Sequence, residues 1–253
     1  MALVITPAIV LSALRYSETS KIVRLATREH GVQSAIAKGA LRPRSRFGAA
    51  LQLLSEGQAQ YLAKEHRELH TLTAFDLQVL HVGLAADLSR YASASVLAEV
   101  MIHFAPADPH PESYDLFRDA LHSLEQAPAT EVESLGFRAL WHLVSVLGFA
   151  PSLETCVRDG TVLPAEGALP FNTREGGALC PACAAQHGAT QLPADARAGL
   201  SALLDPEAPL PTFDERHGAA HRRLLGRYVR YHLAEGAELP GLEFWLRRPW
   251  VAT

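Results

Sequence analysis

Three cysteines are the side chains in this sequence with the clearest potential for chemistry. Two residues separate Cys180 from Cys183, and Cys156 lies 24 positions before Cys180. A C-x₂-C turn lets two thiolates reach one ion, and a structural zinc site takes four ligands in a tetrahedron. In a cytosolic protein, such a set binds zinc more often than it forms a disulfide. The spacing therefore predicts a structural zinc site.

Two residues are candidates for the fourth ligand. Asp159 completes a first knuckle, Cys156-Val-Arg-Asp159, with the same spacing as the second knuckle, and His187 follows Cys183 by four residues. The symmetry of the two knuckles favours Asp159, so the expected ligands are Cys156, Asp159, Cys180 and Cys183. The alternatives are a metal-free knuckle held by packing and a thioredoxin-type redox pair, which would need a βαβ context that is missing.

No catalytic motif accompanies the cysteines. The sequence has no phosphate-binding G-x-x-x-x-G-K-[ST], no G-x-G-x-x-G after a strand, no G-x-S-x-G and no H-E-x-x-H. A catalytic zinc would need an open coordination position and a general base, and nothing in the sequence indicates them. We therefore expect a binding protein that has no catalytic residue and no small-molecule substrate. Any work on nucleic acid would be driven by binding, without ATP.

A basic segment near the start of the chain is the second feature with a chemical use. Two β-rich runs, Lys21–Thr27 and Val32–Lys38, flank a turn-prone Glu-His-Gly, and the loop from Lys38 to Phe47 carries four positive charges and no acid. A hairpin that leads into such a loop presents cations to a phosphate backbone. The alternative is a solvated surface. The candidate contacts are Lys21, Arg24, Lys38, Arg42, Arg44 and Arg46.

The distribution of charge is consistent with that use. The net charge of the chain is −4, which argues against a nucleic-acid binder, but residues 1–80 contain ten Lys or Arg and only six Asp or Glu. A polyanion responds to the local field rather than to the total charge. The asymmetry therefore directs attention to the first third of the chain.

The hydrophobic pattern divides the chain into two kinds of structure. The first eighty residues contain five or six short β-rich runs, including Ala50–Leu54, and suit a small closed barrel, with an SH3-like barrel as the competitor. Helical periodicity begins near Asp76, with a break near Ser89–Ser93, and Thr130 and Glu133 have the spacing of a capping box. Residues 149–192 are rich in Gly and Pro and contain all three cysteines, which is typical of an insertion.

The last long helix, Phe213–Glu235, carries a row of arginines. Their spacing of seven, four and three residues sets them on one face, with Leu224, Tyr228 and Tyr231 turned toward the core. We expect this row to extend the DNA-binding surface, and the alternative is a solvated helix back. Its members are Arg216, Arg223, Arg227 and Arg230.

The chain has no run of 18 apolar residues and no basic start before its first apolar residues, so we expect a cytoplasmic protein without a membrane span or secretory signal.

Several of these segments together resemble the bacterial recombination mediator family RecO. The resemblance lies in Tyr16–Gly31, in Ala37-Lys-Gly-Ala-Leu-Arg42, in Ser45 and in Leu51-Gln52. The segment from Cys156 through Phe171-Asn-Thr-Arg-Glu-Gly-Gly-Ala-Leu-Cys180-Pro-Ala-Cys183 resembles the zinc module of that family. Family members with this module usually have four cysteines, and Asp159 stands at the fourth position here. That departure bears on zinc affinity more than on the shape of the module.

The resemblance implies an α+β multidomain protein. We expect an N-terminal OB-fold β-barrel over residues 1–80, then a mostly α-helical domain over 81–253 with a zinc-finger-like module, 149–192, inserted. It also implies a mediator of DNA repair and homologous recombination that binds single- and double-stranded DNA and anneals complementary strands. With RecR, such a protein helps load RecA onto strands coated by single-strand-binding protein (the RecF/RecO/RecR pathway), and it would be nucleoid-associated.

Two other function classes stay open on the residues alone. One is a protein-interaction adaptor whose basic loop is only solvated surface. The other is a zinc-dependent hydrolase that acts on nucleic acid. The sequence has no cluster of carboxylates of the kind such an enzyme needs, which argues against this class.

Overall fold

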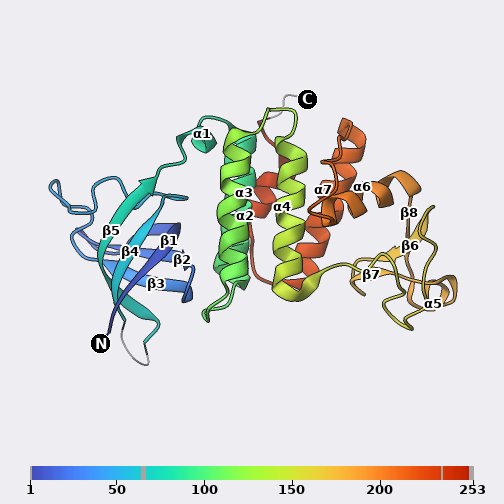
Figure 1. Cartoon of the computed structure of the whole chain (residues 1–253), viewed down its shortest axis with the longest axis horizontal. Coiled ribbons are helices and arrows are strands. Elements are labelled where there is room, and N and C mark those ends of the chain that lie inside the picture. Colours follow the sequence, from blue (N-terminus) through green and yellow to red (C-terminus); the bar gives the residue numbers. More distant parts are fainter. Residues whose placement is uncertain (1, 64–66, 235, 251–253) are drawn as a thin grey trace. The chain divides into compact units, whose positions relative to one another are not determined.

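Five strands of the computed structural model form a closed barrel at the start of the chain (Figure 1). They are β1 (Ala2–Arg15), β2 (Lys21–Thr27), β3 (Gly31–Ala37), β4 (Glu56–Ala63) and β5 (Leu69–Val79). The strand order is β1-β2-β3-β5-β4; β3 and β5 pair in parallel and the other neighbours are antiparallel. The structure describes residues 2–63, 67–234 and 236–250.

The barrel core takes one apolar side chain from every second position of its strands, as the two-residue period of a strand requires. Val23 and Leu25 of β2, Tyr61 of β4 and Leu72 of β5 are all buried. The sheet closes where β3 pairs with β5, over Ser34–Ile36 and Leu69–Thr71. The barrel is thereby a rigid support for the loops that connect its strands.

The expected strand at Ala50–Leu54 is wrong. Residues 38–55 form a series of turns between β3 and β4, and Phe47, Ala50 and Leu51 point into the barrel core. A short apolar run is compatible with a strand or with a buried plug, and periodicity alone does not separate the two. Leu54 has a positive φ of 68°, and its N–H donates to the carbonyl of Val10 at 2.8 Å. The loop is thus anchored at its far end.

Three helices follow the barrel: α1 (Val82–Ala85), α2 (Leu88–Phe104) and α3 (Pro111–Gln126). Strand pairing continues through Val79, so the helical region begins later than the expected Asp76. The break between the first two helices lies at 86–87 rather than at Ser89–Ser93, because the Asp87 carboxylate caps α2 by accepting from the N–H of Arg90 at 2.9 Å. Both α2 and α3 contact β2.

The chain separates into two compact units, Met1–Gln126 and Ala127–Thr253. Helices α1–α3 belong to the first unit together with the barrel. The expected domains divide near residue 80, where strands give way to helices, whereas the compact units divide after α3. The order of the two regions, a β-rich part followed by a helical part, is as expected.

The second unit combines helices with a small sheet. Its elements are α4 (Val132–Val144), a π-helical turn (Ser145–Phe149), β6 (Leu169–Asn172), β7 (Gly177–Ala178), α5 (Pro181–His187), β8 (Thr190–Leu192), α6 (Ala194–Leu204), α7 (Glu215–His232) and α8 (Pro240–Arg247). The three strands have the order β7-β6-β8. Among the described helices, none has the length and apolarity that a membrane crossing requires.

Two details of the helices differ from expectation. Thr130 does not cap α4: Glu131 is the N-cap residue and makes no side-chain cap bond. Glu133 does not complete a capping box and pairs instead with Arg222 and Arg248. Tyr231 is 52% exposed rather than buried. Helix α7 ends at His232, and the expected end at Glu235 lies outside the described residues.

Candidate functional site

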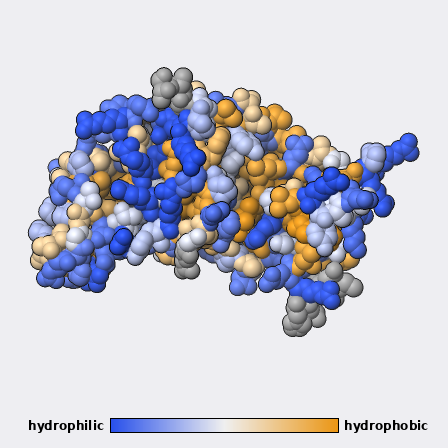
Figure 2. Space-filling model, turned by 180° about the vertical axis from the view of Figure 1, so that it is seen from behind, coloured by the Kyte–Doolittle hydropathy of each residue, from blue (hydrophilic) through white to orange (hydrophobic). Residues whose placement is uncertain are grey.

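The loop between β3 and β4 projects four exposed cationic side chains from the barrel, Lys38, Arg42, Arg44 and Arg46. It is the turn-rich segment beside the β4 and β5 labels in Figure 1, and it forms the projecting blue tip at the right of Figure 2. Among the described residues, none of the four has an ion-pair partner. The loop therefore offers its charge to solvent.

The loop is positioned by contacts with the rest of the barrel. Its apolar side chains Phe47 and Leu51 are 2% exposed, and the N–H of Leu41 donates to the carbonyl of Thr19 in the β1–β2 loop at 3.0 Å. The guanidinium of Arg46 lies 5.0 Å from the centre of the Phe47 ring. The backbone is thus fixed while the cationic ends stay in water.

Lys21 and Arg24, the two strand residues among the expected DNA contacts, have different surroundings. The ammonium of Lys21 donates to the carbonyl of Leu51 at 3.2 Å, and Nη2 of Arg24 donates to the carbonyl of Ile102 in α2 at 3.0 Å. Both side chains are half-buried. They connect parts of the first unit to each other.

Aromatic side chains that could stack on bases are few in the barrel. Phe47, Tyr61 and Phe75 lie in its core, whereas Tyr16, in the β1–β2 loop, is 62% exposed. Stacking on exposed aromatics is the usual second component of single-strand binding by OB-folds. With Tyr16 alone exposed among these four aromatics, the barrel would bind a single strand mainly through charge.

The four expected metal ligands come together in the second unit. One donor atom from each of Cys156, Asp159, Cys180 and Cys183 lies within 4.8 Å of every other. Oδ2 of Asp159 is 3.3 Å from Sγ of Cys180 and 3.3 Å from Sγ of Cys183. His187, at the exposed end of α5, is not part of this group. The donors suit zinc, which takes thiolate and carboxylate ligands in a closed tetrahedral set.

The backbone of the module brings the two knuckles together. Val157 N–H donates to the carbonyl of Ala178 at 3.0 Å, and Ala178 N–H donates to the carbonyl of Ser152 at 2.8 Å. A Cβ at Gly177 would lie 2.5 Å from the carbonyl oxygen of Ser152, so only glycine allows this approach. The paired backbones hold Cys156 and Cys180 in register.

The surroundings of the cluster shift the pKa values of two of its members in opposite directions. The Thr161 N–H, which donates to Oδ1 of Asp159 at 3.0 Å, holds the pKa of that carboxyl well below its usual range. Partial burial, followed by the Asp159 carboxylate, raises the pKa of the Cys183 thiol to about 12. A divalent cation would reverse that second effect, since metal binding displaces thiol protons.

Side chains of helices α6 and α7 form hydrogen bonds with the backbone of the module. The buried Arg197 of α6 donates to the carbonyl of Leu153 at 3.1 Å, and the hydroxyl of Tyr228 in α7 donates to the carbonyl of Gly176 at 3.2 Å. His232, also of α7, lies 2.7 Å from the carbonyl oxygen of Thr173 through Nε2. The module is therefore held by hydrogen bonds to two helices as well as by its own sheet.

The four arginines of α7 are all exposed, yet they are not equivalent. Nε of Arg230 donates to Oε1 of Glu243 in α8 at 3.0 Å. Arg216 and Arg227 border a pocket, and Arg223 lies between them in the sequence. One face of one helix thus carries a paired cation and two cations at the edge of a cavity.

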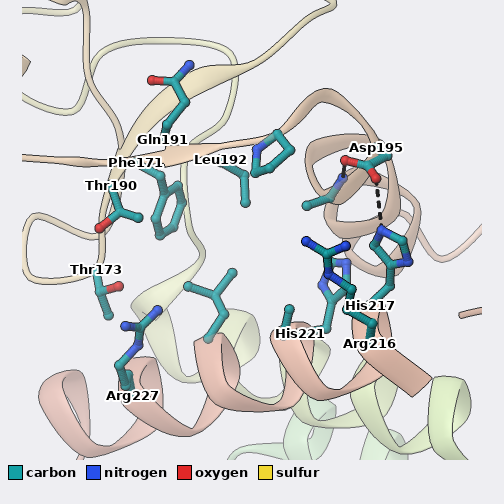
Figure 3. Close-up of a pocket in the computed structure, with 14 residues that line it drawn as sticks. Phe171, Thr173, Thr190, Gln191, Leu192, Asp195, Arg216, His217, His221 and Arg227 are labelled. Atoms are coloured by element: carbon teal, nitrogen blue, oxygen red, sulfur yellow. Dashed lines mark hydrogen bonds and ion pairs between the residues drawn. The ribbon is translucent and has the colours of Figure 1, made fainter. Parts of the chain in front are cut away.

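That pocket is an apolar groove between α7 and the small sheet, with a volume of about 450 Å³. Figure 3 shows Phe171 and Leu192 on one side and the arginines on the other, with an ion pair between Asp195 and His217 at one end (Nε2–Oδ2 3.0 Å). The carboxylates of Asp214 and then Asp195 raise the pKa of His217. The groove offers an apolar floor with a cationic rim.

A further cluster of possible metal ligands, which no spacing in the sequence predicts, lies in the first unit. Glu56 at the start of β4, His81 before α1 and His122 in α3 place one donor atom each within 4.8 Å of the others. Nδ1 of His81 is 2.6 Å from Oε2 of Glu125. Burial raises the pKa of Glu125, but bonds from His81 and the Gly83 N–H outweigh it, and the pKa is lowered. No short motif signals a set drawn from three separate elements.

Comparison with known proteins places these features in a family. The model of the family described as "Recombination protein O N terminal" matches residues 1–78, and that of "Recombination protein O C terminal" matches residues 85–238. A DNA repair protein RecO from Pelobacter propionicus is 33% identical over 238 residues, which cover 94% of each chain. A second, from Symbiobacterium thermophilum, is 36% identical over 208 residues, or 81% of each chain. A third, from Rubrobacter xylanophilus, is 32% identical over 244 residues, covering 95% of this chain and 94% of the relative. The chain belongs to the recombination protein O (RecO) family.

Proposed function

We propose that this protein is a DNA repair and recombination mediator that works by binding and without a catalytic step. It binds single- and double-stranded DNA, anneals complementary strands without ATP and, with RecR, assists the loading of RecA onto strands coated by single-strand-binding protein. Family membership supports the repair role. The observation that carries DNA binding is the exposed loop from Lys38 to Arg46 on an OB-like barrel.

The loop would bind phosphates through the exposed ends of its cationic side chains. Four charges on about nine residues release condensed counterions when they meet a DNA backbone, and this release drives binding regardless of sequence. Lys21, Arg24 and the α7 arginines would contribute less, because several of them already bind protein carbonyls or carboxylates. Two DNA backbones held near one cationic surface repel each other less, and that reduction is the physical contribution annealing requires.

Strand annealing in the absence of nucleotide tests this proposal. The wild type is compared with Arg42→Glu/Arg44→Glu/Arg46→Glu over a series of salt concentrations. We expect the wild type to anneal and the variant to lose most of the activity at low salt, where screening is weakest. Folded wild type that ignores bare oligonucleotides in dilute buffer would favour the adaptor function instead.

We further propose that Cys156, Asp159, Cys180 and Cys183 hold a structural Zn²⁺. The ion would supply only charge compensation and cross-linking of the two knuckles. Three thiolates and a carboxylate form a complete tetrahedral set, though a softer fourth ligand would bind more tightly. Asp159→Cys should therefore raise zinc affinity by about tenfold or more, measured by competition with a chromophoric chelator. His187→Ala, the control, should leave the affinity unchanged; a large loss there would make His187 the fourth ligand.

The apolar groove beside α7 is our candidate for the C-terminal tail of single-strand-binding protein. An acidic peptide that ends in apolar residues and a carboxylate matches an apolar floor with Arg216 and Arg227 at its rim. Mediator function would then join a DNA grip in one unit to a partner site in the other.

A further inference from the structure

A buried histidine in the first unit has a ring nitrogen without a hydrogen-bond partner among the described residues. His81 is 5% exposed, and its Nδ1 lies 2.6 Å from Oε2 of Glu125. A carboxylate only accepts hydrogen bonds, so Nδ1 carries a proton, and in the neutral ring, the form that binds metals, Nε2 presents a lone pair. That Nε2 is completely buried and lacks a hydrogen bond. A buried ring nitrogen of this kind needs a partner, either a proton that pairs with a carboxylate or a metal ion.

A carboxylate oxygen faces this nitrogen from beyond hydrogen-bond distance. Oε2 of Glu56, whose side chain is 13% exposed, lies 3.7 Å from Nε2 of His81 and 3.0 Å from Nε2 of His122. Two unprotonated acceptors that face each other in a buried place repel, and either a proton or a metal ion between them removes that repulsion. The two imidazole nitrogens and the carboxylate oxygen all lie within 4.8 Å of one another, which is the spread of ligands around one ion.

The surroundings of the cluster are built to orient His81. Glu125 accepts from His81 through one oxygen and from the Gly83 N–H, at 2.8 Å, through the other. A Cβ at Gly83 would lie 2.9 Å from the Glu125 side chain, so the glycine leaves room for that carboxylate. A carboxylate that accepts from the far nitrogen of a ligating histidine fixes the ring and increases its basicity, and it is one of the usual second partners of such histidines.

We propose that Glu56, His81 and His122 form a second metal site that binds a divalent transition ion of the Zn²⁺ type. Two imidazoles and one carboxylate suit zinc and its neighbours and do not suit Mg²⁺ or Ca²⁺, which prefer oxygen ligands. Glu56 begins a barrel strand, His81 precedes α1 and His122 lies in α3. The ion would tie the barrel to the helices of its own unit, and a water molecule would complete its coordination.

Cobalt and zinc titrations of the full-length protein, stripped of metal with a chelator, test this proposal. Co²⁺ bound at the cysteine cluster gives a thiolate-to-cobalt charge-transfer band, whereas Co²⁺ held by imidazole and carboxylate does not. We expect the wild type to bind a second equivalent without adding to that band. His122→Gln should lose this second equivalent and keep the charge-transfer band. The side chain of His122 is 38% exposed, so its replacement should leave the fold intact.

Two further variants make the result decisive. His103→Gln removes an exposed histidine of α2 that is not part of the cluster, and it should keep both equivalents. Glu125→Gln leaves all three ligands in place and should weaken the second site by about 10–100-fold, which keeps the test valid if His122→Gln does not fold. A wild type that binds only the equivalent with the charge-transfer band, or a second equivalent that survives both His122→Gln and Glu125→Gln, would overturn the proposal.

Discussion

The cations of the β3–β4 loop and those of α7 have the same chemistry and different surroundings. In the loop, Lys38, Arg42, Arg44 and Arg46 are exposed and have no ion-pair partner in the described part of the chain. On α7, Arg230 is paired with Glu243 of α8, and Arg216 and Arg227 border an apolar pocket. Spacing in the sequence identifies a row of cations, but the acids of other elements decide which of them are available.

The difference follows from what each segment packs against. The loop segment from 38 to 47 contains no acid, and it packs against the barrel through apolar side chains and a backbone hydrogen bond from Leu41 to Thr19. Helix α7 lies in a region, residues 81–253, where 21 acids outnumber 13 Lys and Arg, and acids of α4 and α8 reach its arginines. An arginine there is more often neutralised within the protein.

Reversing the charge of three arginines should have the largest effect on DNA binding. This effect should also differ most between the loop and α7. Arg42→Glu/Arg44→Glu/Arg46→Glu and Arg216→Glu/Arg223→Glu/Arg227→Glu change the net charge by the same amount. We expect the loop variant to reduce the slope of log affinity for DNA against log salt by about three, and the α7 variant by about one or less. Fluorescence anisotropy with a labelled oligonucleotide measures both slopes. Equal slopes would end the distinction between the two sets.

Within the barrel unit, a paired cation should behave as a structural residue. Arg24 donates to the Ile102 carbonyl from a half-buried position, so Arg24→Ala should lower the free energy of unfolding by about 1–3 kcal/mol. Its salt slope for DNA should change by less than one. Lys38→Ala is the matched control and should show the reverse pattern, with unchanged stability in urea. A stable Arg24→Ala variant with weakened DNA binding would assign Arg24 to the DNA surface.

The sequence predicts some of this arrangement and misses the rest for physical reasons. The four members of the cysteine cluster follow from local spacing, because each knuckle is a single turn. The exposure of Arg44 follows from an acid-free loop, but the pairing of Arg24 with an α2 carbonyl depends on a contact 78 residues away. Residues 50–54 have the composition of a strand but form turns, and the side chains of Ala50 and Leu51 are buried in the barrel core.

Longer-range pairing explains the other misses. Glu133 has the spacing of a capping residue, yet two arginines from α7 and the end of α8 take its carboxylate. The cluster of Glu56, His81 and His122 joins residues up to 66 positions apart, and no local pattern marks it. Local chemistry is therefore readable from the chain, whereas the choice among possible partners is made by the fold.

The pocket arginines should separate partner binding from DNA binding. Arg216→Ala/Arg227→Ala should weaken binding of an acidic peptide with an apolar C-terminal end by about tenfold, because two charge-assisted contacts at the rim are lost. DNA affinity should fall less than in the loop variant. Arg223→Ala, on the same helix but outside the pocket lining, is the control and should bind the peptide normally. Isothermal titration calorimetry measures the affinities. An equal loss of peptide affinity in the double variant, the loop variant and Arg223→Ala would contradict a role for the pocket.

Freeing Arg230 from its ion pair should have the smallest effect on DNA binding. It tests most directly whether ion pairing within the protein decides which arginines can bind DNA. Glu243→Gln removes the carboxylate that Arg230 contacts while keeping the shape of the side chain. An exposed pair of this kind contributes about 0–1 kcal/mol, so stability should hardly change.

The gain in DNA affinity from Glu243→Gln has two sources, the general loss of a negative charge and the freed guanidinium. Glu238→Gln, at an exposed position in the same part of the chain, removes one charge without releasing an arginine. If availability matters, Glu243→Gln should bind DNA about twofold more tightly than Glu238→Gln at low salt, with a steeper salt slope. Indistinguishable variants would mean that total charge, and not the pairing of individual arginines, sets the contribution of α7.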